Sequence, residues 1–90
     1  MEIADFLLEV SPETGYDFLT RLEETISDLG KNPRIGSPQE ANDPEIQGLR
    51  VWPVKSFRRY LIFYLIRLDT LDILRIVDSR RDFSLLFHTD

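Results

Sequence analysis

The stretch from Phe57 to Asp82 constrains the fold most, because it holds two apolar runs separated by a short polar break. Apolar residues occupy both alternating faces of the first run, which predicts a strand over 59–68 that is covered on both sides. The second run predicts a strand over 71–79, and the break at Asp69-Thr70 joins the two strands as a hairpin. In the first run, one face carries Tyr60, Ile62, Tyr64 and Ile66, and the other carries Leu61, Phe63 and Leu65.

Arg75 interrupts the apolar sequence of the second run. Strict alternation places Arg75 on the same face as Ile73 and Val77, with Leu74 and Ile76 on the opposite face. A guanidinium group in such a strand needs an ion-pair partner or water. A third strand is predicted over 49–54, where Pro53 favours an edge position or a bulge.

Two helices precede these strands. Ile3, Phe6, Leu7 and Val10 recur at helical spacing, which predicts a short first helix. A second helix is predicted from Pro12 to Leu29, with Ser11 as its N-cap and Gly30 at its end. Its apolar stripe, which is typical of core packing, consists of Phe18, Leu19, Leu22, Ile26 and Leu29.

Residues 31–48 read as a long loop with three prolines and two glycines. The whole chain of 90 residues then forms one domain, residues 1–90. The expected fold class is α+β: an N-terminal helical hairpin packed on a three-stranded antiparallel β-meander.

Charge is divided unevenly between the two halves of the chain. Residues 1–45 hold eleven acidic and three basic residues, whereas residues 46–90 hold eight basic and five acidic residues. The net charge of −5 argues against general affinity for nucleic acid, which depends on neutralising phosphates. The basic half can still meet an acidic partner.

Composition excludes several other classes. The chain has no cysteine, so it has neither a disulfide framework nor a cysteine-based metal site. No signal peptide is evident, and the apolar run that Arg67 interrupts is too short to span a membrane. We therefore expect a cytoplasmic protein that needs no cofactor.

The order of these elements resembles the ParE branch of the RelE/ParE toxins, the toxin halves of type II toxin–antitoxin (plasmid-stabilisation) systems. The resemblance covers most of residues 3–83. After the two helices it rests on Pro33 and Gly36, Leu49-Arg50 and Pro53-Val54, Tyr60 and Tyr64, and Arg81-Asp82.

The chain departs from the family pattern in two places. Family members normally begin with a β-strand, whereas this sequence starts within the first helix. One sheet edge is therefore expected to be unpaired and to favour a homo-oligomer. In addition, Asp78-Ser79 stands where many relatives carry a His-Gly-like pair.

The resemblance implies a bacterial toxin that is not an enzyme, that inhibits DNA gyrase and that a cognate antitoxin neutralises. One alternative is a RelE-like, ribosome-dependent mRNA endonuclease, in which Lys55, Arg75 and Arg81 would have to meet Tyr64 or His88. A second alternative is a truncated, non-toxic remnant that only binds antitoxin or associates with itself.

The candidate site is a surface for binding an antitoxin or a cellular target. The wider basic set, which also reads as an ordinary solvated surface, adds Arg58, Arg59 and Arg80. No catalytic residue and no metal site are assigned, since a lone histidine near a terminus and a tyrosine in an apolar strand are usually structural. The chosen contact residues are Arg50, Lys55, Arg75 and Arg81, with Trp52 as an apolar anchor.

Overall fold

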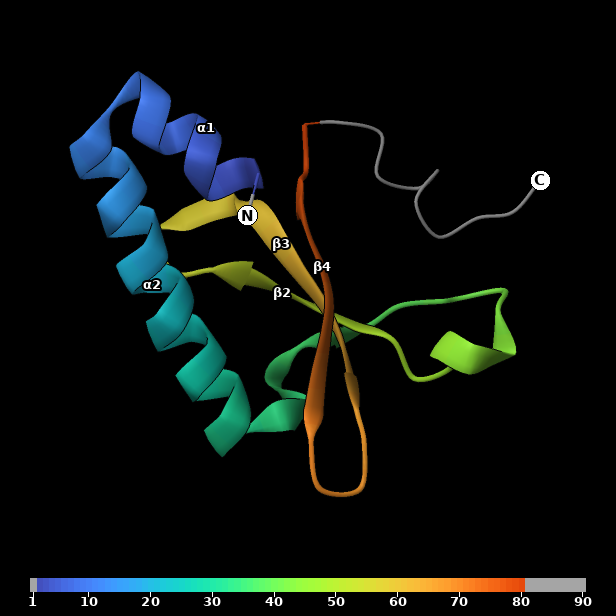
Figure 1. Cartoon of the computed structure of the whole chain (residues 1–90). Coiled ribbons are helices and arrows are strands. Elements are labelled where there is room, and N and C mark those ends of the chain that lie inside the picture. The colour runs from blue at the N-terminus through green and yellow to red at the C-terminus, as the bar shows by residue number, and fades with distance from the viewer. Residues whose placement is uncertain (1, 81–90) are drawn as a thin grey trace.

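The computed structural model describes residues 2–80, which form two helices and a four-stranded antiparallel sheet (Figure 1). Helix α1 spans Glu2–Val10 and α2 spans Pro12–Lys31. Between them the Ser11 hydroxyl accepts a hydrogen bond from the Thr14 N–H at 3.4 Å, so Ser11 is the N-cap as predicted. The α+β class and the helical hairpin are confirmed.

Helix α2 is longer than predicted at its C-terminal end. It continues through Gly30 to Lys31, and the N–H of Asn32 donates to the Asp28 carbonyl at 3.0 Å. The helix ends there because Pro33 disfavours helical geometry at the preceding residue. Asn32 accordingly has φ −145° and ψ 77°.

The sheet contains β1 (Ser37–Pro38), β2 (Arg50–Val54), β3 (Phe57–Ile66) and β4 (Leu71–Asp78), in that spatial order. The sequence predicted the three long strands and missed β1, which pairs with the start of β2. The predicted loop over 31–48 also contains two short 3₁₀ helices, η1 (Pro33–Ile35) and η2 (Pro44–Ile46).

The predicted meander forms, with a hairpin at each of its two turns. Val54 pairs with Phe57 across a two-residue turn in which Ser56 adopts a positive φ of 66°. The Arg67 N–H donates to the Thr70 carbonyl at 2.8 Å across the turn between β3 and β4. The register shifts between Pro53 and Val54, so the irregularity expected at this proline is present.

A second register shift changes which residues share a face of β4. Phe63 pairs with Arg75, but the next residue, Tyr64, pairs with Ile73. The skipped residue is Leu74, so Ile73 turns to the helix side of the sheet while Arg75 stays on the opposite face. The prediction that Ile73 and Arg75 share one face is therefore wrong.

The core has two parts, one on each face of the sheet. The helices cover the first face, and the segment between β1 and β2 covers part of the second (Figure 1). The helix-side core contains Ala4, Phe18, Leu22, Leu29, Val54, Tyr60, Ile62 and Tyr64. The smaller cluster on the opposite face contains Leu49, Phe63, Leu65 and Val77, with Ala41, Ile46, Val51 and Leu61 packed against it.

The apolar stripe predicted on α1 is only half buried. Ile3 and Leu7 pack on the core, but Phe6 and Val10 are 58% and 69% exposed. The helix contacts α2 through Leu8, because an added Cβ at Gly15 would lie 2.6 Å from the Leu8 side chain. Within residues 2–80 no helix is long and apolar enough to cross a membrane.

Candidate functional site

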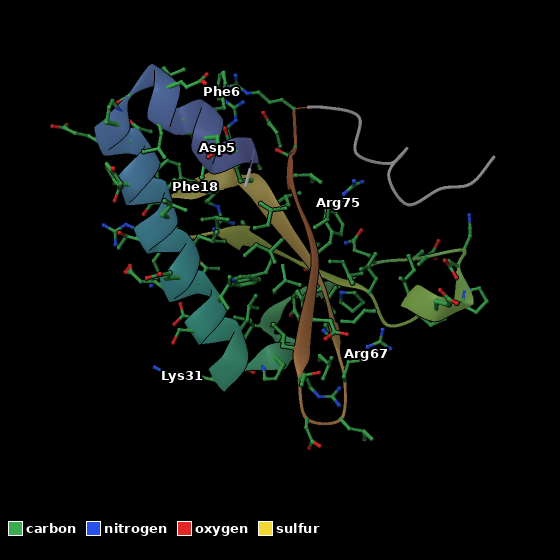
Figure 2. The ribbon with its side chains drawn as sticks, in the orientation of Figure 1. Asp5, Phe6, Phe18, Lys31, Arg67 and Arg75 are labelled. Atoms are coloured by element: carbon green, nitrogen blue, oxygen red, sulfur yellow. The ribbon has the colours of Figure 1, made fainter. Side chains whose placement is uncertain are left out.

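Three of the residues proposed as contacts lie on two opposite faces of the sheet. Arg50 and Trp52 pair across β2 and β3 with Tyr64 and Ile62, both of which belong to the helix-side core. Arg75 pairs with Phe63 on the other face and projects from β4 away from the helices (Figure 2). The structure therefore brings Arg50 and Trp52 together but separates both from Arg75.

Arg50 holds a loop in place. Its Nη1 donates to the Gly36 carbonyl at 2.6 Å and to the Arg34 carbonyl at 3.2 Å. These bonds tie β2 to the segment that contains η1 and β1. The partly buried guanidinium group thus satisfies backbone carbonyls, which leaves it less free for an external partner.

Tyr64 completes this attachment from the neighbouring strand. Its buried hydroxyl donates to the Pro33 carbonyl at 2.6 Å and accepts from the Gly36 N–H at 3.0 Å. Burial raises the pKa of Tyr64 above its ordinary value, although the Gly36 hydrogen bond and the Arg50 charge oppose the shift. The neutral hydroxyl is a structural tie, as the apolar strand around it indicated.

Lys55 lies in the turn between β2 and β3 and faces helix α2. Its ammonium group is 3.4 Å from an Asp28 carboxylate oxygen, and its backbone N–H donates to the Thr25 hydroxyl at 2.9 Å. The Thr25 hydroxyl in turn donates to the Arg21 carbonyl at 2.6 Å. Thr25 is 1% exposed, so this hydroxyl is a buried link between the helix and the turn.

Replacing Thr25 with valine is expected to lower the free energy of unfolding by about 1–2 kcal/mol, because the partly buried Lys55 N–H loses its acceptor. Urea unfolding of the purified protein measures the change. Thr20→Val is the matched control, since the exposed Thr20 hydroxyl bonds only to the Tyr16 carbonyl of its own helix. Equal losses in both variants would show that the link contributes nothing.

Trp52 packs partly buried against the helix-side core. It is therefore part of the layer between sheet and helices. Apolar side chains that are more exposed occur elsewhere, at Phe6, Val10 and Tyr16 on the helices and at Leu68 in the turn after β3. The sequence placed Phe6 and Val10 on the apolar stripe of the first helix, because periodicity alone cannot say which side of a largely apolar helix is covered.

Two of the other basic residues are paired with carboxylates of β4. Arg59 makes two hydrogen bonds to Asp78, one from Nε at 3.3 Å and one from Nη2, and its guanidinium lies 5.1 Å from the Tyr60 ring centroid. Arg67 donates to Asp72 at 2.8 Å. Arg58, Arg75 and Arg80 are exposed.

The ion pair between Arg59 and Asp78 makes part of the stability of the fold depend on pH. The Arg59 hydrogen bonds hold the pKa of the Asp78 carboxyl below its ordinary value of 3.8. A carboxyl group whose folded-state pKa is depressed stabilises the fold fully at pH values above its ordinary pKa. This contribution disappears as the pH falls through the folded-state pKa.

We expect Asp78→Asn to flatten the dependence of stability on pH below the ordinary carboxyl pKa of 3.8. Thermal unfolding followed from neutral to acidic pH provides the measurement. Asp69→Asn serves as the control, because Asp69 lies exposed in the turn before β4 and forms no ion pair within residues 2–80. If Asp78→Asn leaves the dependence of stability on pH as unchanged as Asp69→Asn does, acid does not destabilise the fold through the Arg59–Asp78 pair.

The remaining candidates fall outside the part of the chain that the structure describes. Arg81, the fifth proposed contact residue, and His88, considered for the endonuclease alternative, both lie beyond residue 80. Within residues 2–80, no group of three or more His, Cys, Asp or Glu side chains is placed to hold a metal ion.

Comparison with known proteins gives one match. A family model described as the ParE toxin of a type II toxin–antitoxin system, parDE, matches residues 2–83. Neither a curated protein nor a solved structure matches the chain. The family match covers both helices and all four strands of the described fold.

Proposed function

The chain belongs to the ParE toxin family of type II toxin–antitoxin systems, and on this premise we propose that it inhibits DNA gyrase. A cognate antitoxin, the partner that such a system implies, is proposed to neutralise it by direct binding. The proposed setting is the cytoplasm of a bacterium, where gyrase acts and where such a system would stabilise a plasmid. The match over residues 2–83 carries this proposal.

The arrangement of the polar side chains supports a binding toxin over an endonuclease. An endonuclease of this fold needs an acid, a base and a phosphate-binding cation around one point. Here Tyr64 is buried on the helix side, Lys55 is paired with Asp28, and Arg75 lies on the opposite face. Because these groups do not converge, the endonuclease remains the less supported alternative.

Self-association is a second candidate property of the chain, whether the chain is a toxin or a non-toxic remnant. It is favoured by one observation: β4 is eight residues long and lies at the edge of the sheet. Exposed edge strands pair readily with another chain. Sedimentation velocity over a range of protein concentrations tests this candidate, and a species that stays monomeric throughout contradicts it.

The proposed function is tested by inducing the protein in bacteria with and without the small protein encoded beside its gene. We expect growth arrest that co-expression relieves, together with inhibited supercoiling by purified gyrase and intact ribosomal mRNA. Cleaved mRNA with unaffected supercoiling would favour the endonuclease. Absence of any growth effect would favour the remnant.

A further inference from the structure

The chain between β1 and β2 forms a loop, residues 39–48, whose two ends meet at the edge of the sheet; we call it the strap. The Gln39 N–H donates to the Leu49 carbonyl at 2.8 Å, which closes the strap at its base. Gly48 has a positive φ of 86°, which favours glycine and turns the chain back into β2. Compact loops with adjacent ends often carry a function. Figure 1 shows the strap in green, on the side of the sheet away from the helices.

Several hydrogen bonds join residues of the strap and its base to one another. The Ile46 N–H donates to the Asp43 carbonyl at 3.1 Å, and the Leu49 N–H donates to the Ile46 carbonyl at 3.2 Å. The Gln47 side chain reaches across the loop and donates to the Ala41 carbonyl at 3.1 Å. Because these bonds depend on one another, we expect them to form and break together as one cooperative unit.

The strap packs weakly on the sheet. Within it, only Ala41 and Ile46 are half-buried, and both pack against the smaller apolar cluster on the opposite face. The other residues of the strap are exposed. Its single 3₁₀ turn, η2, is too short to be stable without packing. Opening of the strap therefore exposes little apolar area and costs much less than unfolding of the whole chain.

The chain is held firmly on both sides of the strap. Before it, the Gly36 N–H donates to the Tyr64 hydroxyl, and the Gly36 carbonyl accepts from Arg50. After it, β2 pairs with β3 from Arg50 onward. A movement of the strap is therefore confined to the chain between Gly36 and Arg50, and the two helices and the three long strands can keep their contacts.

We propose that the strap is a lid that opens and closes as one unit while the helices and the long strands stay folded. Opening lifts Ala41 and Ile46 from the smaller cluster and uncovers the apolar side chains that they contact. A molecule that binds the uncovered side chains shifts the equilibrium towards the open state. This property does not depend on the toxin function proposed above.

Amide hydrogen exchange of the full chain, followed residue by residue by NMR, tests the proposal. The amides of Gln39, Ile46 and Leu49 each donate a hydrogen bond in the closed strap. After correction for intrinsic exchange rates, we expect their protection factors to be similar to one another. We also expect these protection factors to be about 100-fold lower than those of the central amides of β3.

Two variants of the strap test whether it opens as a unit. Gln39→Pro removes the N–H that closes the base, and Gln39→Ala is the matched control because it keeps that N–H. Gln39→Pro is expected to lower the protection of Ile46 and Leu49 about tenfold and to leave β3 unchanged. The control should change protection less than about twofold, since the Gln39 side chain is exposed. Ile46→Ala removes the packing instead and should lower the protection of Gln39 and Leu49 together.

Four results would overturn the inference. Strap amides that exchange as slowly as those of β3 would mean that the strap opens only when the whole chain unfolds. Changes confined to the neighbours of each substitution would mean that the strap frays one residue at a time. Equal effects of Gln39→Pro and Gln39→Ala would show that the bond at the base does not close the strap. Equal losses of protection in the strap, the helices and β3 would show that the opening is not local.

Discussion

Phe18→Ala is expected to lower the free energy of unfolding by about 3–5 kcal/mol. The Phe18 ring is fully buried and joins α2 to the sheet. It makes edge-to-face contacts with Phe57 and Tyr60, with both pairs of ring centroids 5.3 Å apart. Truncation removes the buried area and both ring contacts and leaves a cavity between the layers. Urea unfolding followed by circular dichroism measures the loss.

A loss of this size approaches the total stability of a small domain. Phe18→Leu therefore provides a second measurement and is expected to cost about 1–2 kcal/mol, since it keeps most of the buried volume. Phe6→Ala is the matched control on α1, because that ring is 58% exposed. It should change stability by less than about 0.5 kcal/mol. A comparable loss at Phe6 and Phe18 would contradict the assignment of the core.

These two phenylalanines also show what helical periodicity can predict. On α2, charged residues opposite the stripe fix its buried side, and Phe18, Leu22 and Leu29 are buried as expected. On α1 apolar residues occur at most positions around the helix. The sequence alone therefore could not place Phe6 outside the core, and the contact of Leu8 with Gly15 decides the orientation.

The strands show a similar limit. The meander order and the hairpin at Asp69-Thr70 followed from alternation and the polar break, but the face of Ile73 did not. One skipped residue, Leu74, exchanges the faces for every residue on one side of it. A bulge of this kind leaves no sign in a run of uniformly apolar residues. β1 was missed for a different reason, since two residues that include a proline carry no strand pattern.

The candidate site was predicted less well than the fold. The sequence grouped the basic residues as one contact surface, but the partners of these residues lie far away in the sequence. Arg50 bonds to backbone carbonyls of Arg34 and Gly36, and Lys55 pairs with Asp28. Only the folded chain shows that Arg75 is left exposed on the other face.

Gly36→Ala is expected to lower the free energy of unfolding by about 3 kcal/mol. A Cβ at this position would overlap the Tyr64 hydroxyl and lie 2.7 Å from Cε1 and 2.8 Å from Cζ of the same ring. Gly36 has φ −68° and ψ 149°, values that alanine adopts readily, so the loss comes from the contact alone. Urea unfolding measures the loss. Gly30→Ala is the control, because an added Cβ there meets nothing within 4 Å, and it should be neutral or slightly stabilising.

A double-mutant cycle with Tyr64→Phe tests whether Gly36 acts through the tyrosine hydroxyl. Tyr64→Phe alone should cost about 1–3 kcal/mol, because the Gly36 N–H loses its acceptor and the Pro33 carbonyl its donor. It also removes the atom that the new Cβ would overlap, so Gly36→Ala should cost clearly less in the Tyr64→Phe background. Strictly additive losses would mean that the loop is held elsewhere. A strong coupling would show that Gly36 is required at this position because Tyr64 and Arg50 bind the backbone on either side of it.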